Sequence, residues 1–318
     1  MAFHLSSRSQ SVSNSKQGSP IVGRVSEEPL PLPNKNAQNT VTCIYQTNVA
    51  GCWRNVTVLW CKNHTSHTLN LKVDSIRGDF TYTCKIDVKP WYFWNKKGYK
   101  SIGVDGHQVE VYWDLRSAKF SNGSGPEPSS DYYVTLVSDE EVVLFLGDNK
   151  KKAYKRMKMK PSLVGAMLLV KRENMFAKKS FSTKAKFDEK REESDIVVES
   201  STFGQKEPEM WVSIDGIVLI HVKNLQWKFR GNQTVTVNKQ PVQVFWDVHD
   251  WLFSESGSRP GLFIFKPGHV DLEGEKEEKE EKGIEGCDSD DGSTSGYYST
   301  VSYTPFEACH VLYAYKLE

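Results

Sequence analysis

The chain has 318 residues, of which 38% are hydrophobic, 12% are aromatic and 25% are charged. This length accommodates about two domains of ordinary size, and nine tryptophans and fifteen phenylalanines supply enough bulk for sizeable cores, which excludes a chain that is disordered throughout. The formal net charge of +1 excludes a general electrostatic attraction to nucleic acid or to membrane surfaces.

The N-terminal stretch, residues 1–37, is a polar tail that we expect to be disordered. Residues 1–26 are serine-rich and free of acidic side chains, which leaves an organelle transit peptide as an alternative. The sequence has no run of about 18 apolar residues and no apolar signal-peptide core. We therefore expect a soluble protein of the cytoplasm or nucleus, with organelle import as the alternative.

Residues 38–147 predict a first β-domain. At 109–115 the sequence VEVYWDL alternates, so that Val109, Val111 and Trp113 share one face, which predicts a strand with a buried side. The preceding Asp-Gly pair at 105–106 is a two-residue hairpin signal. Further short alternating segments surround this strand, separated by turn residues.

The same phrase returns as VQVFWDV at 242–248, and the segments 86–115 and 220–248 align with one single-residue gap. We expect residues 40–47 to correspond to 167–174 in the same way. The predicted fold class is therefore all-β: two tandem antiparallel β-sandwich or β-barrel domains of about eight strands each, related by internal duplication and joined by a short basic helix. Sandwich and barrel both stay open, because strand order cannot be read from strand count.

The second β-domain is predicted at 166–318, after a basic linker helix at 148–165. In that helix Asp148 is the expected N-cap and Pro161 the expected stop. A stretch rich in Glu, Lys, Asp, Ser and Gly, residues 270–305, interrupts the second domain and is predicted to be a disordered acidic insertion. The apolar segment HVLYAYKL then completes the domain.

Several long phrases carry a family resemblance. TCIYQT, GDFTYTCKIDVKPWYFWNKKGYKS, YWDLRSAKF, LVSDEEVVLFLGD, KSFSTKAKFDEKREESDIVVESS and EPEMWVSIDGIVLIHVKNLQWKFRGNQTV occur in order. The chain resembles the plant-specific domain-of-unknown-function 868 family over roughly residues 38–268 and the last strand. The resemblance implies a plant source and a soluble intracellular protein. It implies no catalytic or binding residue, because the family's biochemical role is uncharacterised.

Recognisable catalytic motifs are missing: the sequence has no GxGxxG, GxxxxGK[ST], HExxH or GxSxG. We expect that the protein is not an enzyme, that it has no cofactor, and that it has no catalytic or metal-binding residue. Cys61, His64 and His67 have spacing that suits zinc, but a polar hairpin turn explains them better. Asp114 and Asp247 follow the repeated tryptophans, and ending a strand or capping a turn explains both better than acid–base catalysis.

Two groups of residues are candidates for binding. The aromatic residues could stack on a flat or sugar-like ligand, although packing in the protein interior is the alternative; they are Trp91, Tyr92, Trp94 and Trp227. The basic residues of the linker helix could contact an anion, although a solvated helix surface is the alternative; they are Lys151, Lys152, Lys155 and Arg156.

These features predict a non-catalytic interaction or binding module. It would meet protein partners through its charged segments or sheet edges, and nucleic acid is not expected as a partner. The alternative is a β-barrel that holds a small apolar or sugar-like ligand at an aromatic-lined mouth. An enzyme of an unrecognised kind is the third interpretation.

Overall fold

The computed structural model describes residues 39–62, 66–88, 96–120, 125–188, 191–201, 207–254, 259–268 and 308–317. These residues form twenty strands and two helices, so the predicted all-β class is confirmed. They belong to one compact unit, Pro33–Glu318. The predicted tail at 1–37 and the whole insertion predicted at 270–305 lie outside the described residues, and the predicted domain boundaries stay predictions.

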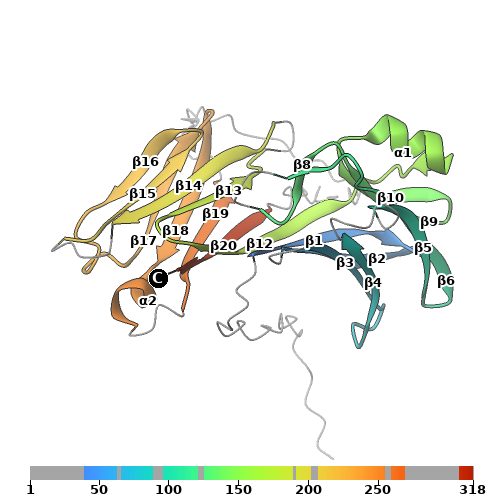
Figure 1. Ribbon diagram of the computed structural model, residues 1–318, viewed down its shortest axis with the longest axis horizontal. Helices are drawn as coiled ribbons and strands as arrows, with labels where there is room; N and C mark the ends of the chain where they lie inside the picture. The colour runs from blue at the N-terminus through green and yellow to red at the C-terminus, as the bar shows by residue number, and fades with distance from the viewer. Residues whose placement is uncertain are drawn as a thin grey trace, which may run out of the picture. The chain divides into compact units, whose positions relative to one another are not determined.

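The largest sheet has nine strands and runs through both halves of the chain (Figure 1). Its central pair, β1 and β12, is antiparallel, whereas β12 and β20 are parallel. In spatial order the strands are β17 (Arg230–Val237), β18 (Gln240–Asp247), β19 (Gly261–Pro267), β20 (Cys309–Lys316), β12 (Met167–Ala177), β1 (Asn39–Val49), β2 (Cys52–Lys62), β3 (His67–Asp74) and β4 (Thr81–Val88).

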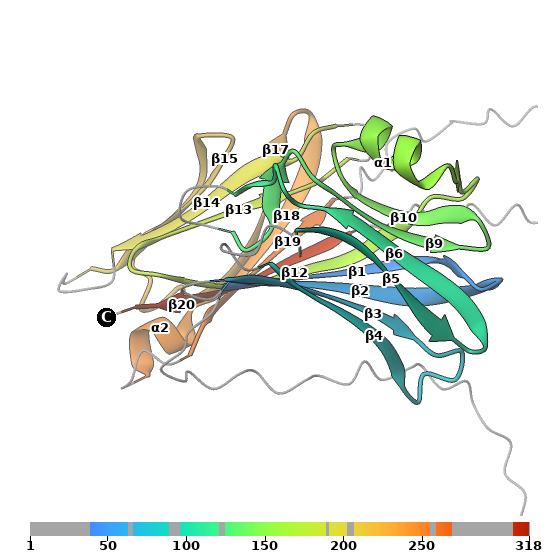
Figure 2. The ribbon, with the colours of Figure 1, turned by 45° about the vertical axis from the view of Figure 1, so that its right-hand side comes forward.

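In the first half, β1–β4 pack face to face against a separate five-stranded sheet, which makes a two-layer sandwich (Figure 2). Alternate β-branched and leucine side chains of both layers point inward, among them Val58, Leu71 and Val111, and are almost fully buried. The second layer consists of β11 (Lys160–Pro161), β10 (Glu141–Gly147), β9 (Tyr133–Ser138), β6 (His107–Asp114) and β5 (Lys97–Val104), with a small ribbon of β7 (Lys119–Phe120) and β8 (Pro128–Ser130) beside it.

In the second half, β17–β20 and β12 pack against a four-stranded sheet of β13 (Ser180–Ala185), β14 (Ser194–Ser201), β15 (Glu209–Ile214) and β16 (Ile217–Val222). The short helix α2 (His249–Phe253) packs against this core. The Trp251 ring lies 5.6 Å from Phe181 and 5.5 Å from Phe263, and its Nε1 donates a hydrogen bond of 2.8 Å to the carbonyl oxygen of Ala314. The second half is therefore also a two-layer sandwich.

The repeated phrase occupies matching places in the two halves. The strand orders β10-β9-β6-β5 and β20-β19-β18-β17 are the same, with β6 and β18 carrying the phrase. Trp113 is paired with Gly98 and Trp246 with Gly231, and a Cβ on either glycine would lie within 2.5 Å of the indole. The match fails at β12, because β1 forms a ladder with β2 whereas β12 and β13 belong to different sheets. Tandem duplication itself therefore stays a prediction.

Helix α1 (Lys150–Met157) is shorter than the helix predicted at 148–165, and both of its predicted ends are wrong. Asn149 is the N-cap residue, and its side chain makes no capping hydrogen bond. The carboxylate of Asp148, the expected cap, instead accepts the N–H groups of Asp131 and Tyr132 at 3.0 and 3.1 Å. The helix ends where Lys158 turns left-handed at φ 58°, before Pro161, which pairs with β10 as part of β11.

Candidate functional site

The structure describes one of the four aromatic residues predicted to contact a ligand. Trp91, Tyr92 and Trp94 lie outside the described residues. Trp227 follows β16 in a turn, and 82% of it is exposed. Nearby in the chain, Phe229 packs edge-on against Phe253 at 5.7 Å, so this turn carries an aromatic surface.

The four basic candidates of α1 divide into two pairs. Lys151 and Lys155 are exposed. Lys152 forms an ion pair of 3.1 Å with Asp114. Arg156 donates hydrogen bonds of 3.1 Å to the carbonyl oxygens of Trp113 and Gly98 and to the Tyr133 hydroxyl. Lys152 and Arg156 thus attach the helix to the sheet beneath it, whereas Lys151 and Lys155 point to solvent.

The cysteine–histidine cluster is only partly described, because His64 lies outside the described residues. Cys61 lies near the end of β2, and His67 begins β3 and stacks on Phe120 with 4.1 Å between ring centroids. Burial, together with the charge of Lys62, lowers the pKa of His67. Within the described part of the chain, no three His, Cys, Asp or Glu residues are grouped as metal ligands.

The two repeated aspartates each end a strand and cap the following turn. Asp114 accepts the N–H of Arg116 at 3.3 Å, and Asp247 accepts that of His249 at 3.1 Å. Burial acts to raise the pKa of Asp114, but hydrogen bonds from Arg116 and Lys152 outweigh it and hold this pKa well below its usual range. Asp247 is more exposed and pairs with Arg230 at 2.7 Å.

Helix α1 covers the outer face of β6, β9 and β10, which we call the covered face (Figures 1 and 2). Ala153 and Met157 point down onto the sheet and are buried. The Met157 sulfur accepts a hydrogen bond of 3.1 Å from the Thr135 hydroxyl. Strand pairing places four side chains of this face in one row, which are Tyr99, Tyr112, Thr135 and Phe145.

The outer face of β17–β20, which we call the open face, has the same register but no covering helix among the described residues. The corresponding row consists of Asn232, Phe245, Ile264 and Val311. Three of these side chains, Asn232, Phe245 and Ile264, border a depression of about 360 Å³, whose lining also includes Arg230, Gly231, Trp246, Asp247 and Leu262.

A second cluster, the polar row, lies inside the molecule where the two cores meet. Cys43, Lys171 and His310 are cross-strand neighbours on β1, β12 and β20. The Lys171 ammonium lies 3.1 Å from Glu173 and donates a hydrogen bond of 2.9 Å to the carbonyl oxygen of Lys184. The His310 Nε2 lies 3.2 Å from the Thr183 hydroxyl, and its Nδ1 is buried with no hydrogen-bond partner among the described residues.

The pKa shifts of the polar row follow from burial and from two carboxylates. Burial acts to lower the pKa of Lys171, but Glu173 and Glu127 outweigh it, so this pKa is raised and the ammonium stays charged. Burial raises the pKa of the Cys43 thiol. Burial also lowers the pKa of His310 to about 4, so its imidazole is neutral at pH 7.

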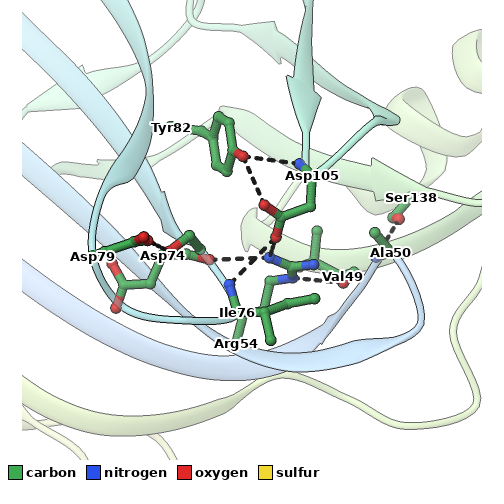
Figure 3. A network of polar contacts seen from close by, with 10 residues as sticks. Val49, Ala50, Arg54, Asp74, Ile76, Asp79, Tyr82, Asp105 and Ser138 are labelled. Carbon is green, nitrogen blue, oxygen red and sulfur yellow. Dashed lines mark hydrogen bonds and ion pairs between the residues drawn. The ribbon is translucent and has the colours of Figure 1, made fainter.

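A buried arginine connects the turns at one end of the first half through hydrogen bonds and an ion pair (Figure 3). Arg54 donates hydrogen bonds to the carbonyl oxygens of Val49 and Asp74 at 2.9 and 3.3 Å and forms an ion pair with Asp105. The Tyr82 hydroxyl donates a hydrogen bond of 2.8 Å to the same aspartate. These contacts join β1, β2, β3 and β4 to the β5–β6 turn.

Sequence reasoning missed Arg54 and the polar row. Arg54 has the same strand parity as Val56, Val58 and Trp60, all buried, so a charge at an inward position was a readable signal. The polar row had no such signal, because both faces of β20 carry mostly apolar or aromatic residues and neither can be read as the interior face.

The fold and these sites define an all-β protein of two joined sandwiches. No helix in the described residues is long and apolar enough to cross a membrane. The sequence matches the family model described as "Plant protein of unknown function (DUF868)" over residues 36–316. The chain belongs to this family, which confirms the resemblance.

No curated protein matches the chain. Among solved structures, the chain is similar to kievitone hydratase from Nectria haematococca, with 9% identity over 73% of this chain and 84% of that chain. The TM-score is 0.25, which is too low to carry an inference about fold or function.

Proposed function

We propose that the protein is a non-catalytic interaction module and that it binds a protein partner through the open face. The observation that carries the proposal is the contrast between two faces of the same register. Thr135 and Tyr112 of the covered face lie under α1, whereas Ile264 and Phe245 at the corresponding positions border a depression.

The side chains of the open face also favour binding to a partner. Where the covered face has Tyr112, Tyr133 and Thr135, the open face has Phe245, Leu262 and Ile264, so three hydroxyl groups are replaced by apolar groups. At these three positions the face with less cover is therefore the more apolar one. Apolar surface of this kind is stabilised when a partner removes it from water.

The chemistry of the polar row supports a non-catalytic role. A nucleophilic lysine needs a lowered pKa and a nucleophilic cysteine needs a thiolate. Lys171 and Cys43 are shifted in the opposite direction, since both pKa values are raised. We propose the cytoplasm or nucleus as the compartment, in which protein partners would meet the open face.

The proposal is tested by the same substitution at two isoleucines, Ile264, which is half-buried in the open face, and Ile217, which is exposed. Ile264→Glu places a charge in the open face, and Ile217→Glu places the same charge on β16, where the isoleucine is 64% exposed. Proteins captured from a plant extract by the wild-type chain should be lost with Ile264→Glu and kept with Ile217→Glu, while both variants melt within a few degrees of wild type. Retention of the same partners by Ile264→Glu would contradict the proposal.

A small sugar-like ligand is the second candidate, favoured by the depression itself. Its volume of about 360 Å³ lies in the range of small-molecule sites. The Phe245 ring offers a stacking face, and the Asn232 amide offers both a donor and an acceptor. Mass spectrometry of small molecules that co-purify with the native protein tests this candidate: a bound ligand should disappear with Asn232→Ala and remain with Ile217→Glu.

A further inference from the structure

We infer that the depression in the open face is a socket for an arginine side chain carried by an amphipathic helix of the partner. This inference rests on the proposed function and names the chemistry of the partner. It starts from the first half, where the place that corresponds to the depression is already filled by Arg156 of α1.

The Arg156 site is defined by four contacts, one of which is a hydrogen bond of 3.1 Å to the Tyr133 hydroxyl. The guanidinium lies 5.7 Å from the centre of the Tyr112 ring, within cation–π range. It donates hydrogen bonds of 3.1 Å to the carbonyl oxygens of Gly98 and Trp113. A planar guanidinium can make these contacts together because its donors form a rigid fork, which a lysine ammonium does not have.

The depression is built from the counterparts of those residues. Strand pairing equates Gly98, Trp113 and Tyr112 with Gly231, Trp246 and Phe245, and all three of the latter line the depression. The second half therefore repeats the ring and the two backbone positions that Arg156 uses, whereas Leu262 stands in the place of the Tyr133 hydroxyl.

The cations around the depression do not argue against an incoming arginine. Arg230 is paired with Asp247 and 65% of its side chain is exposed, so it lies at the rim. Its counterpart by register is Lys97, an exposed cation that coexists with Arg156 in the first half. Lys266 lies 5.9 Å from the Phe245 ring on a side chain that is also exposed.

The contacts of α1 also indicate what the rest of the partner helix carries. Ala153 and Met157 contact the sheet four residues apart, and Lys152 reaches Asp114. The counterparts of the surface beneath them are Ile264, Leu262 and Asp247. The helix that fits the open face therefore carries a small residue and a methionine on one stripe. A lysine and an arginine lie beside that stripe.

The probe is a synthetic peptide of residues 148–160 that contains α1, stapled through positions 151 and 155. Both positions face solvent in α1, so the staple leaves the contact stripe free, and it offsets the low helicity of so short a peptide. Fluorescence anisotropy measures its binding to the full chain. A second peptide carries Arg156→Lys, which keeps the charge and removes the fork.

We expect one peptide per chain, with the Arg156→Lys peptide weaker by roughly tenfold, the factor for losing a charge-assisted hydrogen bond. Phe245→Ala and Ile264→Glu in the protein should weaken the parent peptide by at least as much, and Ile217→Glu should not. Equal binding of the two peptides would overturn the assignment of the depression to an arginine. The proposed function would still stand in that case if Ile264→Glu lost the proteins that the wild-type chain captures from a plant extract. Full binding of the parent peptide to Ile264→Glu would overturn the socket on the open face.

Discussion

The two halves of the molecule share one order of strands, β10-β9-β6-β5 and β20-β19-β18-β17. They differ in what covers the outer face of these strands and in what connects the turns. The first half covers its outer face with α1 and ties its turns with Arg54. The second half leaves the corresponding face open and packs Trp251 of α2 against its core. Interior packing is thus maintained in both halves, whereas the additions at the surface differ, and surface additions are where binding specificity arises.

Truncation of the repeated tryptophans tests whether the halves are equivalent. Trp113→Ala and Trp246→Ala should each lower the free energy of unfolding by about 3 kcal/mol, since each removes a large ring that packs on its paired glycine and against the core of its sandwich. Urea denaturation measures both. Trp227→Ala is the control and should cost less than about 0.5 kcal/mol, because that ring is 82% exposed. A clear difference between the first two variants would break the equivalence.

Removal of an arginine from each half tests the difference at the turns. Arg54→Ala should cost about 3 kcal/mol, because a buried guanidinium with three hydrogen-bond acceptors is lost. Arg230→Ala in the second half should cost less than about 1 kcal/mol, because its ion pair with Asp247 is exposed. Thermal melting of the two variants compares them, and similar losses of stability would contradict the view that a buried ion pair connects the turns of the first half but not those of the second.

Acid tests the junction between the halves. Because the pKa of His310 is about 4 in the folded chain and about 6.5 when unfolded, the unfolded state binds the proton first as the pH falls. The stability that the neutral imidazole provides is therefore complete above pH 6.5 and is lost between about pH 6.5 and pH 4, with a loss near 2 kcal/mol at pH 5.

Urea denaturation of wild type and His310→Gln at pH 7 and pH 5 isolates this contribution. Lys171, Glu173 and Glu127 are present in both proteins, so the difference reports His310 together with its coupling to Glu173, which lies 3.9 Å from His310 Nε2. The variant should lose less stability than wild type on acidification. An equal loss of stability in the two proteins would show that His310 does not cause the sensitivity to acid.

Substitution at the start of α1 has the smallest expected effect. Asp148→Ala should cost about 1 kcal/mol, because its carboxylate accepts two backbone N–H groups that would lose their partner. Asn149→Ala should change almost nothing, because its side chain makes no capping hydrogen bond. Melting temperatures compare the two variants, and a larger loss for Asn149→Ala than for Asp148→Ala would contradict these assignments.

Local patterns in the sequence were sufficient for the strands but not for their assembly. Alternation predicted the faces of Val109 and Val111, and the Asp-Gly turn at 105–106 lies where expected. The pairing of β1 with β12 joins segments more than a hundred residues apart, and no local pattern specifies it. For the same reason Lys171, a polar residue in a strand, could not be assigned to the interior.

The candidate site was predicted only in part. Trp227 and the basic residues of α1 were recognised by type, but the role of Arg156 depends on carbonyl oxygens of Gly98 and Trp113, which carry no sequence signal. Phe245 lies inside the repeated phrase, where alternation places it on the face opposite Val244 and indicates nothing more. Its significance came from comparison with Tyr112 under α1, which requires the register of both sheets.

The position of β20 has a consequence for synthesis of the chain. This strand follows all the others in sequence, yet it lies between β19 and β12 in the middle of the nine-stranded sheet. At a ribosomal rate of roughly 5–20 residues per second, the stretch between β19 and β20 takes on the order of 2–8 s to emerge. During that interval β19 and β12 each present an unpaired edge, which is the kind of surface that aggregates or recruits chaperones. The nascent second half is therefore most vulnerable immediately before its final strand leaves the ribosome.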